Sequence, residues 1–332
     1  MLAAPLAGAG EGRPEAVVKP KRLEQGDLVG LVAPSGSSWE DEDVRFAADV
    51  VESLGYRVRL GRHVFARRGY LAGEDEQRAA DFNAMFADDE VDAVFAIQGG
   101  YGAQRILPLV DFEAIRAHPK ALLGYSDITA LLNAVHSRTG LVTFHGPIAK
   151  GNFTPYTLAE FRKVLTSPRE TVEIGSPPPF ERRPGWVERE NRRTTIVGGK
   201  ARGRLVGGNL TLLSTLMGTP FQPDFAGKIL FLEDVHEEPY RVDRMLTQLW
   251  LAGAFEAAAG VVVGKLTDAD PTGGRSLSLE EILVDRLRPL GKPAYRGAMI
   301  GHVDDKTVVP LGVEAEMDAD AGTLTLLEAA VR

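Results

Sequence analysis

Short apolar stretches alternate with amphipathic stretches through the first half of the chain. DLVGLVAPSG, residues 27–36, reads as a buried strand ending in turn residues, and one helix face follows it at Val44, Ala47, Ala48, Val51 and Leu54. The alternation continues through YRVRLG, EDEQRAADFNAMFAD, VDAVFAI, a helical stretch after Tyr101, ALLGYS, DITALLNAVHSR and LVTFH. This pattern predicts a doubly wound parallel α/β sheet, in which ligands bind at the carboxyl ends of the strands.

The pattern changes after GSPPPFERRPG, residues 175–185, whose four prolines and two glycines predict a domain junction. Strands are then expected at GRLVGGN, GKILFLED, AGVVVGKL and AYRGAMIGH, with a terminal hairpin turning at 320–322 and helices at 210–217, 240–251 and 279–287. We therefore expect a flexible tail at 1–22, an N-terminal α/β domain at 23–170, a linker at 171–200 and a strand-rich C-terminal domain at 201–332.

Composition narrows the possible functions. The 332 residues are 44% hydrophobic and 25% charged, as in ordinary folded proteins, and the absence of cysteine excludes thiolate nucleophiles, zinc ribbons and iron–sulfur clusters. A net charge of −8 argues against nucleic acid and anionic membranes as partners. No apolar run approaches the roughly 20 residues of a membrane span. We expect a cytoplasmic protein, with a poorly formed export signal at the N-terminus as the alternative.

The sharpest chemical motif is Gly124-Tyr125-Ser126-Asp127, where a buried strand turns directly into a helix. A Gly-x-Ser at such a junction is typical of a nucleophile elbow, in which the tight turn exposes the hydroxyl and the helix N-terminus offers N–H groups to an oxyanion. The usual final glycine is missing. In the alternative interpretation, Ser126 or Asp127 is simply the N-cap of the helix.

A second glycine cluster, Gln98-Gly99-Gly100-Tyr101-Gly102, follows the strand VDAVFAI. Glycines at the carboxyl end of a strand let backbone N–H groups approach a substrate, as an oxyanion hole requires, although a plain tight turn also explains them. Their spacing is not the dinucleotide-binding fingerprint G-x-G-x-x-G.

A reactive serine needs a base and an orienting carboxylate. His145, His236 and His302 all lie at or just after expected strand ends, and each is also compatible with a structural role. Glu233 and Asp234, which close the strand KILFL, are the best placed carboxylates. The acidic run EDVHEEPYRVD has no metal-ligand spacing, so no metal is expected and activity should resist chelators.

Read together, these residues resemble the LD-carboxypeptidases, a serine peptidase family that includes muramoyltetrapeptide carboxypeptidase and the microcin-C immunity peptidase. The resemblance covers about residues 23 to 330. Its landmarks are GDLVGLVAPSG (26–36), GGYGAQRILPLVDF (99–112), GYSDITALL (124–132), FHGP (144–147), GGNLTLL (207–213), LFLEDVHEEPYRVDRML (230–246) and GHVDDKTVVPLG (301–312).

The resemblance implies a Ser-Glu-His triad, with Ser126 as nucleophile, Glu233 as carboxylate and His302 as general base. The main-chain N–H groups of Gly100 and Asp127 would form the oxyanion hole. It also implies an amidotransferase-like doubly wound N-terminal domain, a swivelling β/β/α C-terminal domain, no cofactor and a homodimer.

The substrate implied by the resemblance is a small peptide. Such an enzyme would trim murein tetrapeptide to tripeptide in cytoplasmic cell-wall recycling, by cleaving the amide bond between an L-centre and the terminal D-alanine. A microcin-immunity-like peptidase would instead hydrolyse peptide–nucleotide conjugates with the same triad. A protein of another class, a non-catalytic small-ligand binder, would use the serine only as a helix cap.

Five residues are candidates for substrate binding: Gln98, Gly99, Tyr101, Asn209 and Trp186. Gln98 occupies a position where the family usually has an arginine able to pair with a substrate carboxylate. Trp186 lies in residues 181–204, which contain seven arginines and one lysine against three glutamates. This segment suits either a loop that stacks on a nucleobase or an anchor at a domain or dimer interface.

Overall fold

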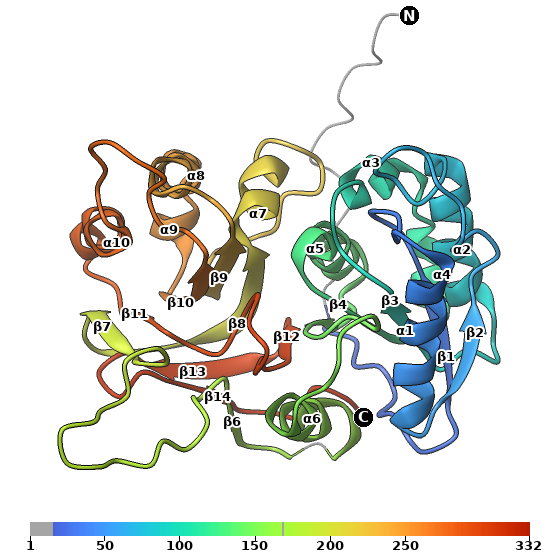
Figure 1. Cartoon of the computed structure of the whole chain (residues 1–332), viewed down its shortest axis with the longest axis horizontal. Helices are drawn as coiled ribbons and strands as arrows, with labels where there is room; N and C mark the ends of the chain where they lie inside the picture. The colour runs from blue at the N-terminus through green and yellow to red at the C-terminus, as the bar shows by residue number, and fades with distance from the viewer. Residues whose placement is uncertain (1–15, 168) are drawn as a thin grey trace, which may run out of the picture.

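A computed structural model describes residues 16–167 and 169–332, and Figure 1 shows two halves side by side, each built around one β-sheet. The first sheet has six strands in the order β2-β1-β3-β4-β5-β12. Strands β1 to β5 are parallel, and β12 pairs antiparallel with β5 at the edge. The strands are β1 Leu28–Val32, β2 Arg57–Leu60, β3 Ala93–Ala96, β4 Ala121–Gly124, β5 Thr143–His145 and β12 Val309–Leu311.

Helices connect these strands, as the alternating pattern predicted. They are α1 Asp41–Ser53, α2 Asp75–Ala87, α3 Ala103–Ile106, α4 Phe112–Ala117 and α5 Thr129–Thr139. Helix α6, Pro155–Phe161, follows β5 and leads to the second sheet. The strand order reverses between β1 and β3, so the loops that follow these two strands meet, and Gly36 N–H donates to Gly99 O at 3.1 Å. This reversal is the topological switch point at which open α/β sheets bind ligands.

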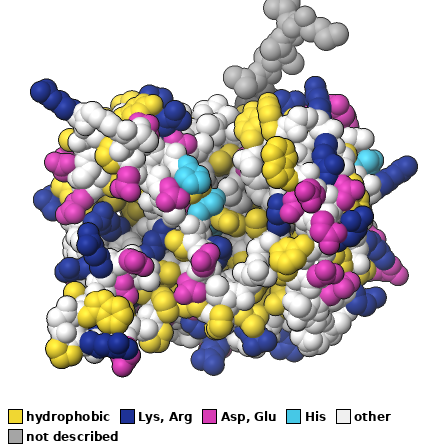
Figure 2. Space-filling view, viewed as in Figure 1, with side chains coloured by type: hydrophobic (Ala, Val, Ile, Leu, Met, Phe, Trp, Pro, Cys, Tyr) yellow, Lys and Arg dark blue, Asp and Glu magenta, His cyan; other side chains and the backbone are white. Residues whose placement is uncertain are grey.

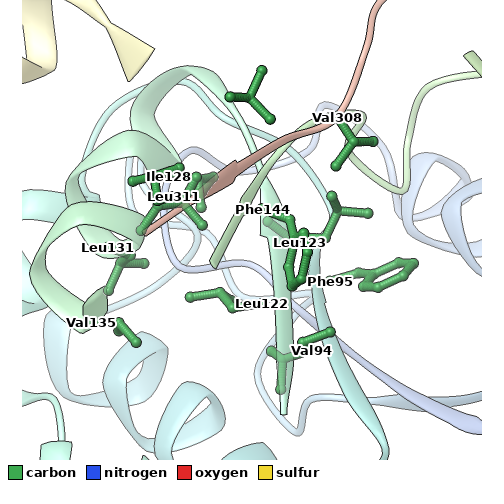
Figure 3. Close-up of a cluster of buried hydrophobic side chains, with 14 of the residues drawn as sticks. Val94, Phe95, Leu122, Leu123, Ile128, Leu131, Val135, Phe144, Val308 and Leu311 are labelled. Atoms are coloured by element: carbon green, nitrogen blue, oxygen red, sulfur yellow. The ribbon is translucent and has the colours of Figure 1, made fainter. Parts of the chain in front are cut away.

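An apolar core supports this edge of the first sheet. Figure 3 shows Leu123 of β4 and Phe144 of β5 packed with Ile128 and with Leu311 of β12. All four side chains are fully buried. The turn between β4 and α5 therefore packs on side chains of β4 and β5 and on a side chain of β12, a strand far away in the sequence.

The second sheet has eight strands in the order β6-β14-β13-β8-β9-β10-β11-β7. Its central strands β8 to β11 are parallel and the outer pairings are antiparallel. The strands are β6 Val172–Ile174, β7 Thr194–Val197, β8 Lys200–Asn209, β9 Ile229–Val235, β10 Gly260–Thr267, β11 Ala294–Arg296, β13 Glu314–Asp318 and β14 Thr323–Leu326.

Four helices belong to this half: α7 Leu210–Leu216, α8 Pro239–Leu251, α9 Ala254–Ala257 and α10 Leu279–Leu287. A separate apolar cluster joins them to the parallel strands, with Leu246 and Phe255 against Leu230 and Val261. The two-domain α/β fold with a strand-rich second half is thus confirmed. In the part of the chain that the structure describes, no helix is long and apolar enough to span a membrane.

The structure differs from the expected boundaries in three places. Within the expected linker 171–200, β6 and β7 join opposite edges of the second sheet. Strand β12 leaves the second half and completes the first sheet. Residues 16–22, expected in a flexible tail, are bound to the fold: Val18 N–H donates to Gly140 O at 2.9 Å and Arg22 N–H to Arg332 O at 3.0 Å. The rest of that tail, 1–15, lies outside the described residues.

Candidate active site

Ser126 lies in a strained turn at the carboxyl end of β4. Its φ is +62°, a left-handed conformation that costs a non-glycine residue about 1–3 kcal/mol. The chain turns there into a short 3-10 helix, Ser126–Ile128, which continues into α5. Gly124 makes the turn possible, since a Cβ at that position would lie 2.8 Å from Ile128 Cγ2. This strained strand-to-helix turn has the form expected of a nucleophile elbow.

Neither Ser126 nor Asp127 is the N-cap of α5. The N-cap is Ile128, which makes no side-chain cap hydrogen bond. The buried carboxylate of Asp127 instead accepts hydrogen bonds from the Ser35 hydroxyl and, at 2.7 Å, from Ala103 N–H. Asp127 therefore ties the elbow to the loops that follow β1 and β3.

The glycine loop after β3 contacts the serine directly. A Cβ on Gly99 would lie 3.1 Å from Ser126 Oγ, 2.9 Å from Ser126 Cβ and 3.5 Å from Asp127 N. Gly100 has a φ of +111°, which strongly favours glycine at this turn. The backbone segments that carry the two expected oxyanion donors, Gly100 N–H and Asp127 N–H, therefore lie against each other beside the hydroxyl.

Glu233 and His302 form a hydrogen-bonded pair on the second half of the molecule. Glu233 is fully buried on β9, and His302 Nδ1–H donates to its Oε2 at 2.8 Å. Gly301 allows this approach, because a Cβ there would lie 2.7 Å from the same oxygen. The Tyr125 ring packs on the His302 ring with 4.7 Å between centroids. Tyr125 directly precedes Ser126, so the expected nucleophile is one residue away from a ring that contacts the His302–Glu233 pair. The assignment of these three residues as a triad stays a prediction.

A second histidine lies on the other side of the Glu233 carboxylate. His145 Nε2, buried at the end of β5, is 3.4 Å from Glu233 Oε1, and in the described chain neither atom has a hydrogen-bond partner of good geometry. Burial alone would raise the pKa of Glu233, but the two histidines outweigh it and lower that pKa to about 2. Glu233 is thus ionised and accepts only, so His302 donates from Nδ1 and its neutral form has a free lone pair on Nε2.

Histidine 236 is placed differently. Its side chain is exposed in the loop after β9 and its Nε2 lies 3.0 Å from Asp268 Oδ2. Figure 2 shows histidine side chains at the surface between the two halves of the molecule. Within 16–167 and 169–332, no group of three or more histidine and acidic side chains is arranged to hold a metal ion.

Gln98 and Tyr101 lie at the rim of the glycine loop. The Gln98 amide donates to Gly36 O at 3.0 Å and accepts from the Ser38 hydroxyl at 3.3 Å, so it braces the loop after β1. Tyr101 is exposed and packs edge-on against Tyr70, with 5.6 Å between ring centroids. Of these two expected substrate-binding residues, Tyr101 has the more accessible side chain.

Asn209 and Trp186 are each held by contacts with other residues. Asn209 is buried, donates to Asp234 Oδ1 at 2.9 Å and accepts from Leu212 N–H as the N-cap of α7. Trp186 lies in the exposed loop between β6 and β7, packed on Phe180. Figure 1 shows this loop at the lower left, away from β4 and α5. Both assignments as substrate-binding residues stay predictions.

Sequence reasoning did not single out Lys306. This side chain follows His302 by four residues, and its Nζ lies 5.3 Å from the centre of the Tyr125 ring. Burial lowers the pKa of its ammonium group. The signal available in the sequence was its position in the same GHVDDKTVVPLG segment as the expected base.

Comparison with known proteins assigns both halves of the chain. Residues 29–146 match the LD-carboxypeptidase N-terminal domain and residues 202–317 match the LD-carboxypeptidase C-terminal domain. The chain is 43% identical to a probable murein peptide carboxypeptidase of Bacillus subtilis, over 94% of this chain and 95% of that protein. It is 34% identical to a murein tetrapeptide carboxypeptidase of Pseudomonas aeruginosa, over 88% and 93% of the two chains.

A solved structure of the microcin C7 self-immunity protein MccF superposes with a TM-score of 0.85 at 26% identity, covering 95% of this chain and 99% of that one. These matches, which extend over both sheets and the site between them, do not support the alternative of a non-catalytic binder. The chain belongs to the LD-carboxypeptidase family and is a serine-type carboxypeptidase.

Proposed function

We propose that this protein removes the terminal D-alanine of murein tetrapeptide by cleaving the amide bond that joins it to the preceding L-centre. The observation that carries the proposal is the strained Ser126 turn, whose neighbour Tyr125 packs on the His302–Glu233 pair. The relatives named murein peptide and murein tetrapeptide carboxypeptidase support this choice of substrate.

The proposed mechanism is acyl transfer through the serine. His302 Nε2 accepts the Ser126 proton as Oγ attacks the scissile carbonyl, and ionised Glu233 stabilises the imidazolium that forms. The N–H groups of Gly100 and Asp127 stabilise the oxyanion, an effect worth roughly 100- to 1000-fold per donor. His302 then gives its proton to the leaving amine of D-alanine, and water releases the tripeptide from the serine.

The test is to incubate the purified protein with murein tetrapeptide and with a small panel of peptide–nucleotide conjugates. Mass spectrometry should show tripeptide and free D-alanine in equal amounts. A fluorophosphonate reporter should label Ser126 and no other serine. Absence of tripeptide, or cleavage confined to the conjugates, would contradict the proposed substrate.

A microcin-immunity-like activity on peptide–nucleotide conjugates is the second candidate. The likeness to MccF favours it, as does the loop at 175–193, where the Arg183 guanidinium lies 5.2 Å from the centre of the Trp186 ring. An arginine-stacked indole is suited to bind an adenine or a phosphate. In this candidate the catalytic residues are the same and the recognised group is the nucleotide.

The resemblance also leads us to propose a homodimer that acts in the cytoplasm. Sedimentation equilibrium of the purified protein tests the first part. Cell fractionation with an antibody against the chain tests the second, and a monomer or an exported protein would contradict the respective proposal.

A further inference from the structure

A carboxypeptidase that acts on a free C-terminus has to accommodate the terminal carboxylate close to the scissile bond. Moving a carboxylate from water into a partly closed site costs several kcal/mol unless a cation pairs with it. The position before the glycine loop is Gln98, a neutral side chain. A cation elsewhere around Ser126 is therefore required.

Most cations on the loops near Ser126 already have carboxylate partners. Arg105 Nη2 lies 2.7 Å from Asp75 Oδ2, and Arg78, which is fully buried, pairs with the same aspartate. Lys150 Nζ lies 2.9 Å from Asp43 Oδ2. Binding a substrate carboxylate at any of these three would compete with an existing ion pair.

Lys306 is the exception among the described residues around the elbow. Among the described residues no salt bridge joins its Nζ to a carboxylate, although the charges of Asp304, Glu233 and Asp305 act on it from further away. The ammonium rests on the face of Tyr125. The neighbouring Asp305 carboxylate is held by the Thr154 hydroxyl at 2.6 Å instead. Lys306 thus presents a half-buried positive charge beside the ring that contacts His302.

The segment that carries Lys306 is fixed in place. Lys306 N–H donates to Thr157 Oγ1 at 3.0 Å, and the same hydroxyl donates to Asp304 O at 3.0 Å. The Thr307 hydroxyl donates to the buried Glu160 carboxylate at 2.5 Å. Helix α6 therefore anchors the backbone on both sides of the lysine, so little ordering entropy is lost when an anion binds.

We propose that Lys306 binds the C-terminal carboxylate of the peptide substrate, an inference that rests on the proposed function. His302 must pass its proton to the leaving amine, so the leaving amino acid lies beside His302. Tyr125 packs against that imidazole, and Lys306 packs against Tyr125. The carboxylate is two bonds from the leaving nitrogen, which puts it on the side of the site that Lys306 occupies. Lys306 is then a specificity-determining residue that separates free peptides from blocked ones.

The experiment compares the tetrapeptide with its C-terminal amide in the wild type, in Lys306→Met and in Lys306→Arg. The wild type should prefer the free acid. Lys306→Met should reduce kcat/KM for the acid about tenfold to a hundredfold, mainly through KM, and so erase the preference. Lys306→Arg, which keeps the charge, should restore a large part of it. Lys150→Met is the matched comparison, because its ammonium already has a partner.

Two results would overturn the inference: equal losses on acid and amide in Lys306→Met, or loss of the acid preference in Lys150→Met alone. Calorimetry with the inactive Ser126→Ala protein measures binding without cleavage and so separates this inference from the proposed function. Tighter binding of acid than amide that depends on Lys306 supports the inference even if the wild type cleaves neither. Equal binding of the two overturns it.

Discussion

Ser126 adopts a backbone conformation that its side chain disfavours, and this conformation exists because the surrounding loops impose it. Gly99 and Gly124 leave room for the turn, and the Asp127 carboxylate fastens it to Ser35 and Ala103. Ser126 carries both the backbone strain and the hydroxyl of the proposed nucleophile. Two substitutions that each remove the hydroxyl, but differ in backbone strain, can separate the two effects.

We expect both Ser126→Ala and Ser126→Gly to abolish hydrolysis, because loss of a triad nucleophile lowers kcat on the order of a million-fold. Their stabilities should differ. Glycine adopts a φ of +62° without strain. The free energy of unfolding of Ser126→Gly should therefore be about 1 kcal/mol higher than that of Ser126→Ala. Urea denaturation of the two variants measures the difference. Retention of a tenth of the wild-type rate in either variant would contradict the triad assignment.

His302 and His236 provide a matched pair for the assignment of the base. His302→Ala should lose nearly as much activity as Ser126→Ala and Glu233→Gln somewhat less, and neither loss should add to that of the serine variant. His236→Ala should stay active, because His236 is exposed and contacts Asp268. An inactive His236→Ala beside an active His302→Ala would reverse the assignment.

The pH profile follows from the charge of Glu233. Its pKa of about 2 keeps this carboxylate ionised throughout the working range, so the acid limb of kcat/KM should report the histidine base. Activity should be lost through a single ionisation as the pH falls, and Glu233 should not contribute to it. Two ionisations in the acid limb of the wild type would show that a second group controls the base.

At the residue scale, the sequence and its resemblance predicted a triad of Ser126, Glu233 and His302. The structure shows the hydrogen bond between His302 and Glu233 and the packing of His302 on Tyr125, and the triad itself stays a prediction. The contact between His145 and Glu233 could not be predicted, because it joins β5 of one sheet to β9 of the other. The same holds for Lys306, whose place over Tyr125 depends on how α6 anchors its backbone.

At the scale of elements, the sequence predicted the long helices and most of the strands, and it missed β6, β7 and β12. Helix α10 was expected at 279–287 and spans Leu279–Leu287, and α8 begins one residue before its expected start. Strands β6, β7 and β12 have three or four residues each. All three lie at sheet edges, where the strand that pairs with each one determines its structure.

The role of the loop between β6 and β7 in substrate recognition can be tested at Trp186. Trp186 packs on Phe180 and Arg183 of the same loop, so we expect Trp186→Ala to change turnover of murein tetrapeptide by less than about fivefold, under roughly 1 kcal/mol of transition-state binding. Steady-state kinetics on tetrapeptide and on an adenylate conjugate check this. A loss beyond a hundredfold confined to the conjugate, with poor wild-type turnover of tetrapeptide, would favour the second candidate function.

At the scale of the whole molecule, His136 couples stability to pH. It lies buried on α5, donates from Nδ1 to Leu141 O at 3.0 Å, and packs so closely on Gly312 that a Cβ there would lie 2.1 Å from its Cε1. Burial, helped by the charges of Lys228 and Arg204, outweighs the hydrogen bond to Leu141 O and lowers its pKa from 6.5 to about 4. The folded state therefore favours neutral His136.

Because the folded pKa is lower than the unfolded one, this contribution to stability is fully present above about pH 6.5 and is lost as the pH falls towards 4. Between about pH 7 and about pH 5 the free energy of unfolding should fall by about 2 kcal/mol from this residue alone. His136→Gln should flatten that decline, as measured by urea denaturation at several pH values.

The control is His118→Gln, at a partly exposed histidine paired with Asp89, which should leave the decline unchanged. The same decline of unfolding free energy with pH in the wild type and both variants would contradict the prediction.

Strand β12 has a consequence for how the chain is made. Its residues 309–311 form an edge strand of the first sheet, yet a ribosome synthesises them long after the other five strands of that sheet. Until then the free edge of β5, which ends at His145, has no neighbour on that side, and such an edge invites pairing with other chains. His302 also emerges only shortly before β12. A chain that stops before β12 therefore keeps an open sheet edge, and one that stops before residue 302 also lacks the proposed base, so neither the sheet nor the proposed site can be completed from the first half alone.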